Sequence, residues 1–178
     1  MSSPIAHTAA AYAVYSAFRR KLPESSVLGM SHRLAWPLIV IFISLLPDLD
    51  VIAAMTIGSL EKFHNNLSHS LAICTAAAVI LAPLLRLCAN APLGTGFLLS
   101  ITCCYSHILI DFFTRGRGIM LFWPFTEMRY HAPVTLFIGV PWSSGLTSPL
   151  YLKMIINDLG FAAVVVGLVA ITRRFRPQ

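Results

Sequence analysis

The chain has 178 residues, of which 57% are apolar and only 11% are charged, and its formal net charge is +6 at pH 7. A soluble domain averages about 25% charged residues, so this chain has too few of them to cover a water-facing surface. We therefore exclude a soluble globular domain and predict a single integral membrane domain over residues 1–178.

The first two apolar runs have different lengths. Residues 4–18 are helix-forming, but fifteen residues rise only about 22 Å, which is short of the ~30 Å hydrocarbon core. This helix either crosses obliquely with help from its neighbours or enters the membrane only partway. After a polar hinge at residues 19–33, the run at residues 34–57 is long enough to span, but "PDLD" interrupts it. Pro47 is expected to break or kink that helix.

Three further segments complete the predicted fold. Residues 67–87 and 93–113 form the third and fourth apolar runs, and residues 154–172 form a last helix. Between the fourth run and the last helix, residues 114–152 mix Gly, Pro, Trp and charged residues with short apolar pieces. We expect loops and a short helix there, with a re-entrant segment as a further option. The predicted fold class is all-α, a polytopic membrane bundle of four to five transmembrane helices.

The basic residues flank the apolar runs, as charges that set membrane topology do. No basic stripe interleaved with aromatic residues is present, so we predict no nucleic-acid partner. With five crossings, eight Lys and Arg residues fall on one side and five on the other. The positive-inside rule then places the N-terminus outside and the eight-residue side in the cytoplasm. That side holds Arg19, Arg20, Lys21, Arg33, Arg86, Arg173, Arg174 and Arg176, and the other holds Lys62, Arg115, Arg117, Arg129 and Lys153.

The four cysteines are Cys74, Cys88, Cys103 and Cys104, and all lie in or beside apolar runs. They form no CxxC pair, and their spacing does not indicate a disulfide framework. We interpret them as small packing residues.

Under the same threading, seven ionisable residues from four separate segments gather at one membrane face, which would be the outer one. They are His7, Asp48, Asp50, His64, His69, His107 and Asp111.

The pair in "HILID", His107 and Asp111, is spaced i and i+4, so both side chains lie on one helix face. The pair can chelate a metal ion, or the aspartate can simply orient the histidine. Asp48 and Asp50 lie within a membrane run, where a carboxylate costs ~2.5–3.5 kcal/mol and is functional by default. A helix cap formed by Asp48 is the structural alternative.

The two histidines of "HNNLSHS", His64 and His69, are five residues apart and would diverge on a continuous helix. They converge only if residues 64–66 form a loop leading into the helix, with Ser68 or Asn66 as its N-cap. His7 lies alone on an alanine-rich helix. The alternative to a metal-binding role for His7 is therefore an incidental histidine. His131, in "RYHAP", lies on the same side of the membrane as these residues. It is a candidate for contact with substrate, and an incidental position is the alternative.

Imidazole and carboxylate are ligands that zinc and related divalent metals accept. We predict a divalent metal site, with zinc expected and one or two ions held. The candidate ligands are His7, Asp48, His64, His69, His107 and Asp111. Asp50 and Asp48 are the candidate catalytic carboxylates, with Asp50 acting as a base or as a carboxylate that orients the ligands. The candidate substrate-binding residues are Arg115, Arg117, Arg129 and His131.

These motifs, in the order His7-Thr8, "PDLD", "HNNLSHS", "HILIDFFT" and "WPF", resemble the YdjM-like family of inner-membrane, metal-dependent hydrolases. The resemblance runs from residue 7 to about residue 125. The family pattern has His-Arg-Gly and Thr-His-Ser where this chain has His64-Asn65-Asn66 and Ser68-His69-Ser70. A weaker similarity links the chain to zinc-dependent phospholipases C, which are helical and gather matching residue types in the same order. In this chain those residues are His7, Asp48, His69, His107 and Asp111.

The sequence thus predicts an inner-membrane, multi-pass metallohydrolase that cleaves an ester or phosphoester of a lipid-type substrate, with membrane lipid as its surroundings. A transporter for metal ions or protons remains an alternative, because intramembrane Asp and His also line ion paths. A non-enzymatic membrane protein with a structural metal is the third interpretation. The sequence predicts no particular oligomeric state.

Overall fold

The computed structural model describes residues 3–57, 64–141, 144 and 147–175, although the side chains of residues 53 and 57 are outside this description. These residues contain α-helices and short 3-10 turns but no β-strand, which confirms the all-α prediction. The helices are α1 (Pro4–Phe18), α2 (His32–Leu45), α3 (Asp50–Ile57), α5 (Leu71–Ala89), α6 (Leu93–Phe112) and α7 (Pro149–Phe175).

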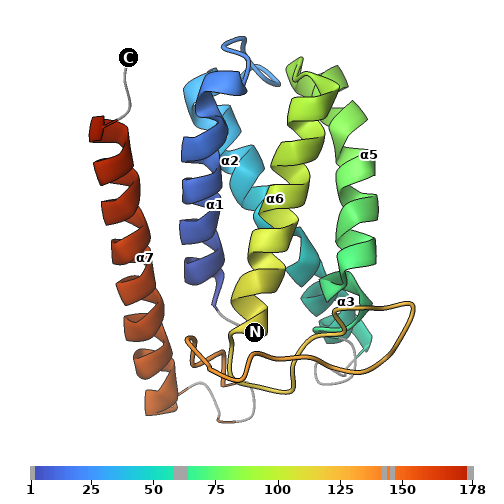
Figure 1. Cartoon of the computed structure of the whole chain (residues 1–178), viewed down its shortest axis with the longest axis vertical. Coiled ribbons are helices and arrows are strands. Elements are labelled where there is room, and N and C mark those ends of the chain that lie inside the picture. Colours follow the sequence, from blue (N-terminus) through green and yellow to red (C-terminus); the bar gives the residue numbers. More distant parts are fainter. Residues whose placement is uncertain (1–2, 58–63, 142–143, 145–146, 176–178) are drawn as a thin grey trace.

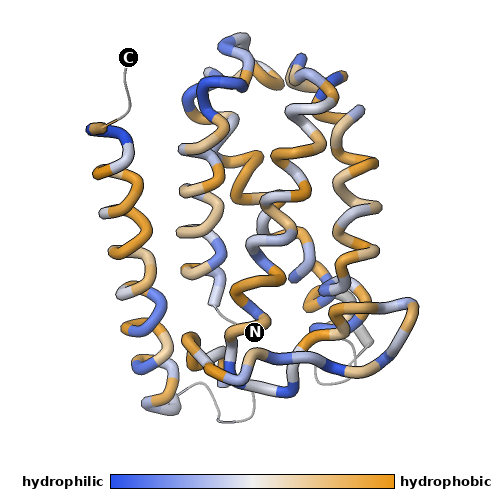
Figure 2. Tube along the Cα trace, in the orientation of Figure 1, coloured by the Kyte–Doolittle hydropathy of each residue, from blue (hydrophilic) through white to orange (hydrophobic). Residues whose placement is uncertain are grey.

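Four stretches are long and apolar enough to cross a membrane: His32–Thr56, Leu71–Ala89, Leu93–Phe112 and Pro149–Phe175. The helices stand side by side as a bundle, and the loop after α6 runs across one end of it (Figure 1). Helix α1 packs against α2, α6 and α7, and α5 packs against α6. Hydrophobic residues cover most of the length of these helices, while hydrophilic residues gather towards the two ends (Figure 2).

Helix α1 has the predicted bounds and lies inside the bundle. Pro4 occupies its first turn, and the Ser3 hydroxyl accepts a hydrogen bond from the Ile5 amide at 3.2 Å. Ala6, Ala9 and Ala11 are buried, because small side chains allow neighbouring helices to approach closely. The contacts with three neighbours supply the support that a fifteen-residue helix needs in a membrane.

The predicted break at Pro47 is confirmed. Helix α2 ends at Leu45, a 3-10 turn covers Leu46–Leu49, and α3 begins at Asp50. Since proline has no amide hydrogen, it cannot continue the α-helical hydrogen-bond pattern from the preceding turn. The break places Asp48 in the 3-10 turn and Asp50 in the first turn of α3.

The segment before α5 is a loop, as predicted, but the predicted helix cap is wrong. Residues 64–66 form a turn in which Asn65 has a φ of 59°, and a 3-10 turn then covers Leu67–His69. Ser70, rather than Ser68 or Asn66, caps α5, because its hydroxyl accepts a hydrogen bond from the Ile73 amide at 3.2 Å.

The C-terminal part also differs from the prediction. Helix α7 begins at Pro149, five residues earlier than expected, and ends at Phe175. The described residues between α6 and α7 contain no α-helix; they form an irregular loop with isolated bridges between Thr114 and Phe137 and between Ile119 and Tyr130. Proline at the first helical turn loses no hydrogen bond, which explains why α7 starts there.

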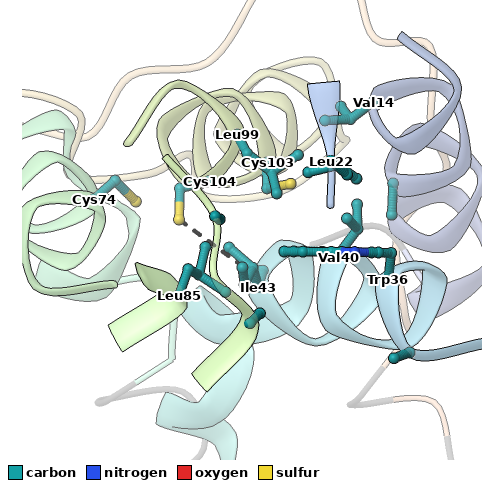
Figure 3. Packing of buried hydrophobic residues seen from close by; sticks show 14 of the residues in the cluster. Val14, Leu22, Trp36, Val40, Ile43, Cys74, Leu85, Leu99, Cys103 and Cys104 are labelled. Atoms are coloured by element: carbon teal, nitrogen blue, oxygen red, sulfur yellow. Dashed lines mark hydrogen bonds between the residues drawn. The ribbon is translucent and has the colours of Figure 1, made fainter. Parts of the chain in front are cut away.

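The apolar core fills the bundle between its two ends. Trp36, Val40 and Ile43 of α2 pack with Leu99 and the cysteines of α6 and with Leu85 of α5 (Figure 3). Three of the four cysteines are buried here, as predicted. Cys88 is exposed instead, so its interpretation as a packing residue is wrong: it lies on an outward face of α5.

The two ends of the bundle carry the charges in the predicted way. Helices α1 and α5 end, α2 begins and α7 ends at the same end of the bundle, which therefore collects Arg19, Arg20, Lys21, Arg33, Arg86, Arg173 and Arg174 (Figure 1). The long loop and its arginines lie at the opposite end. Lys62 and Arg176, which also entered the count of charges, lie outside the described residues.

Candidate metal centre

All seven ionisable residues singled out in the sequence lie at one end of the bundle. His7 comes from the first turns of α1, and Asp48 and Asp50 come from the break after α2. The loop and 3-10 turn before α5 supply His64 and His69, and the last turns of α6 supply His107 and Asp111. The prediction that these four segments converge is therefore met by the geometry.

Four of these residues form a tight, buried cluster: Asp48, His69, His107 and Asp111. One potential ligand atom from each lies within 4.8 Å of the others. His69 and His107 are fully buried and Asp111 is 2% exposed. The side chain of Asp48 is 11% exposed and is the most accessible of the four.

Five of the six ligand–ligand distances within the cluster match the edges of a metal-coordination tetrahedron. From His69 Nε2 the distances are 3.3 Å to Asp48 Oδ1, 3.2 Å to Asp111 Oδ2 and 3.2 Å to His107 Nε2. From His107 Nε2 they are 3.3 Å to Asp48 Oδ1 and 3.5 Å to Asp111 Oδ2. Four ligands about 2.0–2.1 Å from a zinc ion are separated by about 3.3–3.4 Å. The donor set therefore has the spacing that one such ion requires.

The hydrogen-bond network directs the Nε2 atoms of both histidines into the cluster. His107 Nδ1 donates to the backbone carbonyl of Ser44 at 2.8 Å, which leaves Nε2 as the acceptor nitrogen of the neutral ring. The Ser68 hydroxyl donates to Asp50 Oδ2 at 2.6 Å, so it accepts from His69 Nδ1 at 2.9 Å. His69 therefore also presents an unprotonated Nε2. Such contacts at the far nitrogen typically orient histidine ligands of metals.

The carboxylates of the cluster favour a cation between them. Within the described chain neither oxygen of Asp48 receives a hydrogen bond. A buried group of acceptors this close together needs positive charge for its stability.

Asp50 lies beside the cluster and holds the loop. Its Oδ1 accepts from His64 Nδ1 at 2.6 Å, and its Oδ2 accepts from the Asn65 amide at 3.1 Å as well as from Ser68. Asp48, Asp50 and His64 also form a second group whose potential ligand atoms lie within 4.8 Å of one another. Asp48 is common to both groups, so the residues present fit two neighbouring ions as well as one.

His7 contacts the cluster from the side of α1 and is outside both groups. Its ring stacks on that of His107, with centroids 3.7 Å apart and planes inclined by 9°. Its Nε2 atom lies 3.5 Å from Asp111 Oδ1. The structure thus places this predicted ligand against two other candidate ligands.

The four predicted substrate-binding residues fall into two pairs. Arg117 donates to the backbone carbonyl of His64, and Arg129 donates to the carbonyl of Asn65 at 3.0 Å and to the Asn66 side chain. Both guanidinium groups therefore hold the histidine-bearing turn. Arg115 and His131 are exposed, and among the contacts of the described residues none joins them to the cluster.

Comparison with known proteins agrees with this arrangement. The model of the family described as "YdjM inner membrane protein" matches residues 1–176. The chain belongs to the YdjM family. It is also similar to the inner membrane protein YbcI of Escherichia coli strain K12, with 26% identity over 140 residues that cover 74% of this chain and 80% of YbcI. No solved structure matches the chain.

Family membership and four candidate spans together identify this YdjM-family chain as a multi-pass inner membrane protein. They confirm the resemblance to the YdjM-like family. The weaker similarity to zinc-dependent phospholipases C has no support from these comparisons.

Sequence reasoning missed one buried carboxylate of the YdjM-family chain. Asp158 of α7 is fully buried, and it accepts hydrogen bonds from the amide of Ser3, at 3.1 Å, and from the Ser3 hydroxyl. It therefore ties α7 to the start of α1, one turn before His7. The sequence signal that could have revealed Asp158 is a single aspartate inside an apolar helix.

Proposed function

We propose that this protein is a membrane-embedded, metal-dependent hydrolase that cleaves an ester or phosphoester bond in a lipid-type substrate. The observation that carries the proposal is the four-residue cluster of two imidazole nitrogens and two carboxylate oxygens at tetrahedral spacing. This cluster lies at one end of a transmembrane bundle. The positive-inside rule places that end at the outer face.

Asp48, His69, His107 and Asp111 would hold the first ion, for which zinc fits the nitrogen and oxygen donors. The group of Asp48, Asp50 and His64 would hold a second ion. When bound, zinc would supply Lewis acidity and lower the pKa of coordinated water from 15.7 to about 7.

The two candidate catalytic carboxylates have different surroundings. Asp50 accepts hydrogen bonds on both oxygens, from His64, the Asn65 amide and Ser68, so we assign it the orienting role rather than that of the base. Asp48 accepts no hydrogen bond within the described chain, and both of its oxygens are buried in the site. With only the first ion bound, we assign its second oxygen the role of accepting a proton from an attacking water.

A lipid-type substrate is supported by an apolar groove of about 680 Å³ on the surface of the bundle, along α6 and beside the first residue of α5. Its volume is within the range of about 300–1,000 Å³ that small-molecule sites occupy. The groove runs along α6 from Ile101 to Phe112 and is bordered by Leu71 and Leu121. Leu71 is two residues from His69, and Phe112 directly follows Asp111. We propose that an acyl or prenyl chain lies in this groove while the scissile bond reaches the cluster.

The groove wall is apolar although it contains hydroxyl groups. The lining hydroxyls of Thr102 and Ser106 donate to the carbonyls of Leu98, at 2.6 Å, and Cys103, at 2.8 Å. The lining hydroxyl of Tyr105 donates to the Thr75 hydroxyl at 2.8 Å, because Thr75 itself donates to the Leu71 carbonyl. Since each lining hydroxyl has a partner, the wall can contact a hydrocarbon chain without leaving a hydroxyl unpaired.

The packing above the cluster supports hydrolysis over ion conduction. Apolar side chains of α1, α2, α5 and α6 pack against one another in the interior of the bundle (Figure 3). An ion path needs polar groups through the whole depth of the membrane.

The test is hydrolysis by the purified protein in detergent, with phospholipids and polyprenyl phosphates as substrates and zinc supplied. We expect product release by the wild type, and loss of at least about a hundredfold in Asp48→Asn, in line with the size of general base catalysis. Arg86→Gln, at the opposite end and outside both proposed sites, is the control and retains activity. A protein that binds zinc but cleaves none of these lipids would contradict the proposal and favour a structural metal.

A further inference from the structure

The opposite end of the bundle contains a second, polar pocket that is independent of the proposed hydrolase site. It lies where the chain turns from α1 to α2 and has a volume of about 270 Å³. The residues that give it its character are Arg19, Arg20, Glu24, His32, Arg33 and Trp36.

The hairpin between the two helices gives this pocket a fixed shape. Leu22 and Val27 are buried against the bundle, and backbone hydrogen bonds join Val27 and Met30 at 2.9 and 3.0 Å. Trp36 is 1% exposed, and its indole Nε1 donates to the carbonyl of Pro23 at 2.9 Å. The hairpin therefore packs on the bundle and forms a wall of the pocket.

The pocket has an excess of positive charge. Three guanidinium groups line it against the single carboxylate of Glu24. All three arginines are exposed, and in the described part of the chain neither Arg19 nor Arg33 forms an ion pair. Guanidinium groups pair with phosphate through parallel hydrogen bonds, and basic pockets between transmembrane helices bind anionic headgroups.

We propose that this pocket binds the phosphate-bearing headgroup of an anionic phospholipid. Its position favours a lipid over a free phosphate, because it lies between the ends of helices in the bundle, at the level where lipid headgroups lie. Tyr15 and Leu22 supply apolar wall beside the arginines, which suits the glycerol and upper acyl carbons of a lipid. The pocket thus fixes a lipid at the end of the bundle away from the metal centre.

The experiment is native mass spectrometry of the full-length protein, titrated with phosphatidylglycerol or with phosphatidylcholine of the same acyl chains. A third titration uses glycerol 3-phosphate. We expect saturable binding of phosphatidylglycerol and weak binding of the other two. An arginine near a membrane surface contributes about 1 kcal/mol, so the double variant Arg19→Gln, Arg33→Gln should bind about thirtyfold more weakly.

The matched control is Arg86→Gln, Arg174→Gln, which removes two exposed arginines at the same end but outside the pocket and should bind as the wild type does. Thermal unfolding checks that both variants are folded; should the pocket double variant be unfolded, Arg33→Gln alone should weaken binding about fivefold. Equal binding of the two lipids, or equal losses in the two double variants, would overturn the proposal. Tight binding of glycerol 3-phosphate would show that the pocket takes free phosphate instead. Since lipid binding is measured without hydrolysis, the result does not depend on the metal centre.

Discussion

The Nε2 atoms of His69 and His107 lie 3.2 Å apart, although 38 residues separate them in the chain. Each ring donates its Nδ1 hydrogen elsewhere, so the two nitrogens present lone pairs to each other and to two carboxylate oxygens. Four acceptors in one buried space repel one another unless a cation lies between them. This arrangement is the physical basis of the proposed metal centre.

Asp50→Asn should weaken metal binding without abolishing it. The amide keeps the shape of the side chain but removes the negative charge that orients His64 and His69. Loss of such an orienting carboxylate typically costs about 10- to 100-fold in metal affinity. Titration of zinc in competition with a chelator measures this change, and an affinity equal to that of the wild type would show that Asp50 does not orient the ligands.

Arg129→Gln should loosen the turn at residues 64–66. Arg129 donates to Asn65, Gly118 and Asn66, and hydrogen bonds from charged groups contribute about 1.5–3 kcal/mol each. We expect faster amide hydrogen exchange in this turn, read by mass spectrometry. Arg115→Gln is the matched control, because Arg115 is exposed and lies in the same loop. Equal exchange in the two variants would show that Arg129 does not hold the turn at residues 64–66.

Asp158→Ala should destabilise the protein by about 1–3 kcal/mol, because it leaves the buried Ser3 amide and hydroxyl without their acceptor. Thermal unfolding in detergent measures the loss. Lys153→Ala, on an exposed position of the same helix, should have little effect. If both substitutions shift the midpoint equally, the contact between α7 and α1 contributes no stability.

Ile101→Trp should obstruct the groove along α6 and so discriminate between substrates. We expect KM for a long-chain substrate to rise about tenfold, which is within the cost of overpacking an apolar site. A short-chain ester should be hydrolysed as before. Val166→Trp, on the exposed face of α7, is the control. An equal change in KM for long-chain and short-chain substrates would show that the groove does not bind the acyl chain.

Much of the fold follows from hydrophobic runs and from one proline. The run at residues 4–18 coincides with α1, and Pro47 ends α2 because it lacks an amide hydrogen. The start of α7 at Pro149 was missed, although a serine followed by proline at the first helical position is a helix-start signal in the sequence. The N-cap of α5 was misplaced for a local reason: four serine or asparagine side chains in "HNNLSHS" can fill the same role.

The sequence predicted which residues form the candidate site better than it predicted what each of them does. Imidazoles and carboxylates in apolar runs are costly, so their clustering at one end indicated a shared ligand. Sequence spacing did not reveal that Arg117 and Arg129 contact the turn at His64, since 53 and 64 residues separate the bonded pairs. The contact between Ser3 and Asp158 joins residues 155 apart, and only the packing of α7 on α1 brings them together.

The metal content of the purified protein tests the central claim most directly. We expect at least one equivalent of zinc in the wild type after exposure to the metal and removal of the excess, measured by elemental mass spectrometry. His69→Ala and Asp111→Ala should lose that ion, whereas His32→Ala, at the other end of the bundle, should retain it. Equal metal content in all four proteins, or no metal in the folded wild type, would contradict the account.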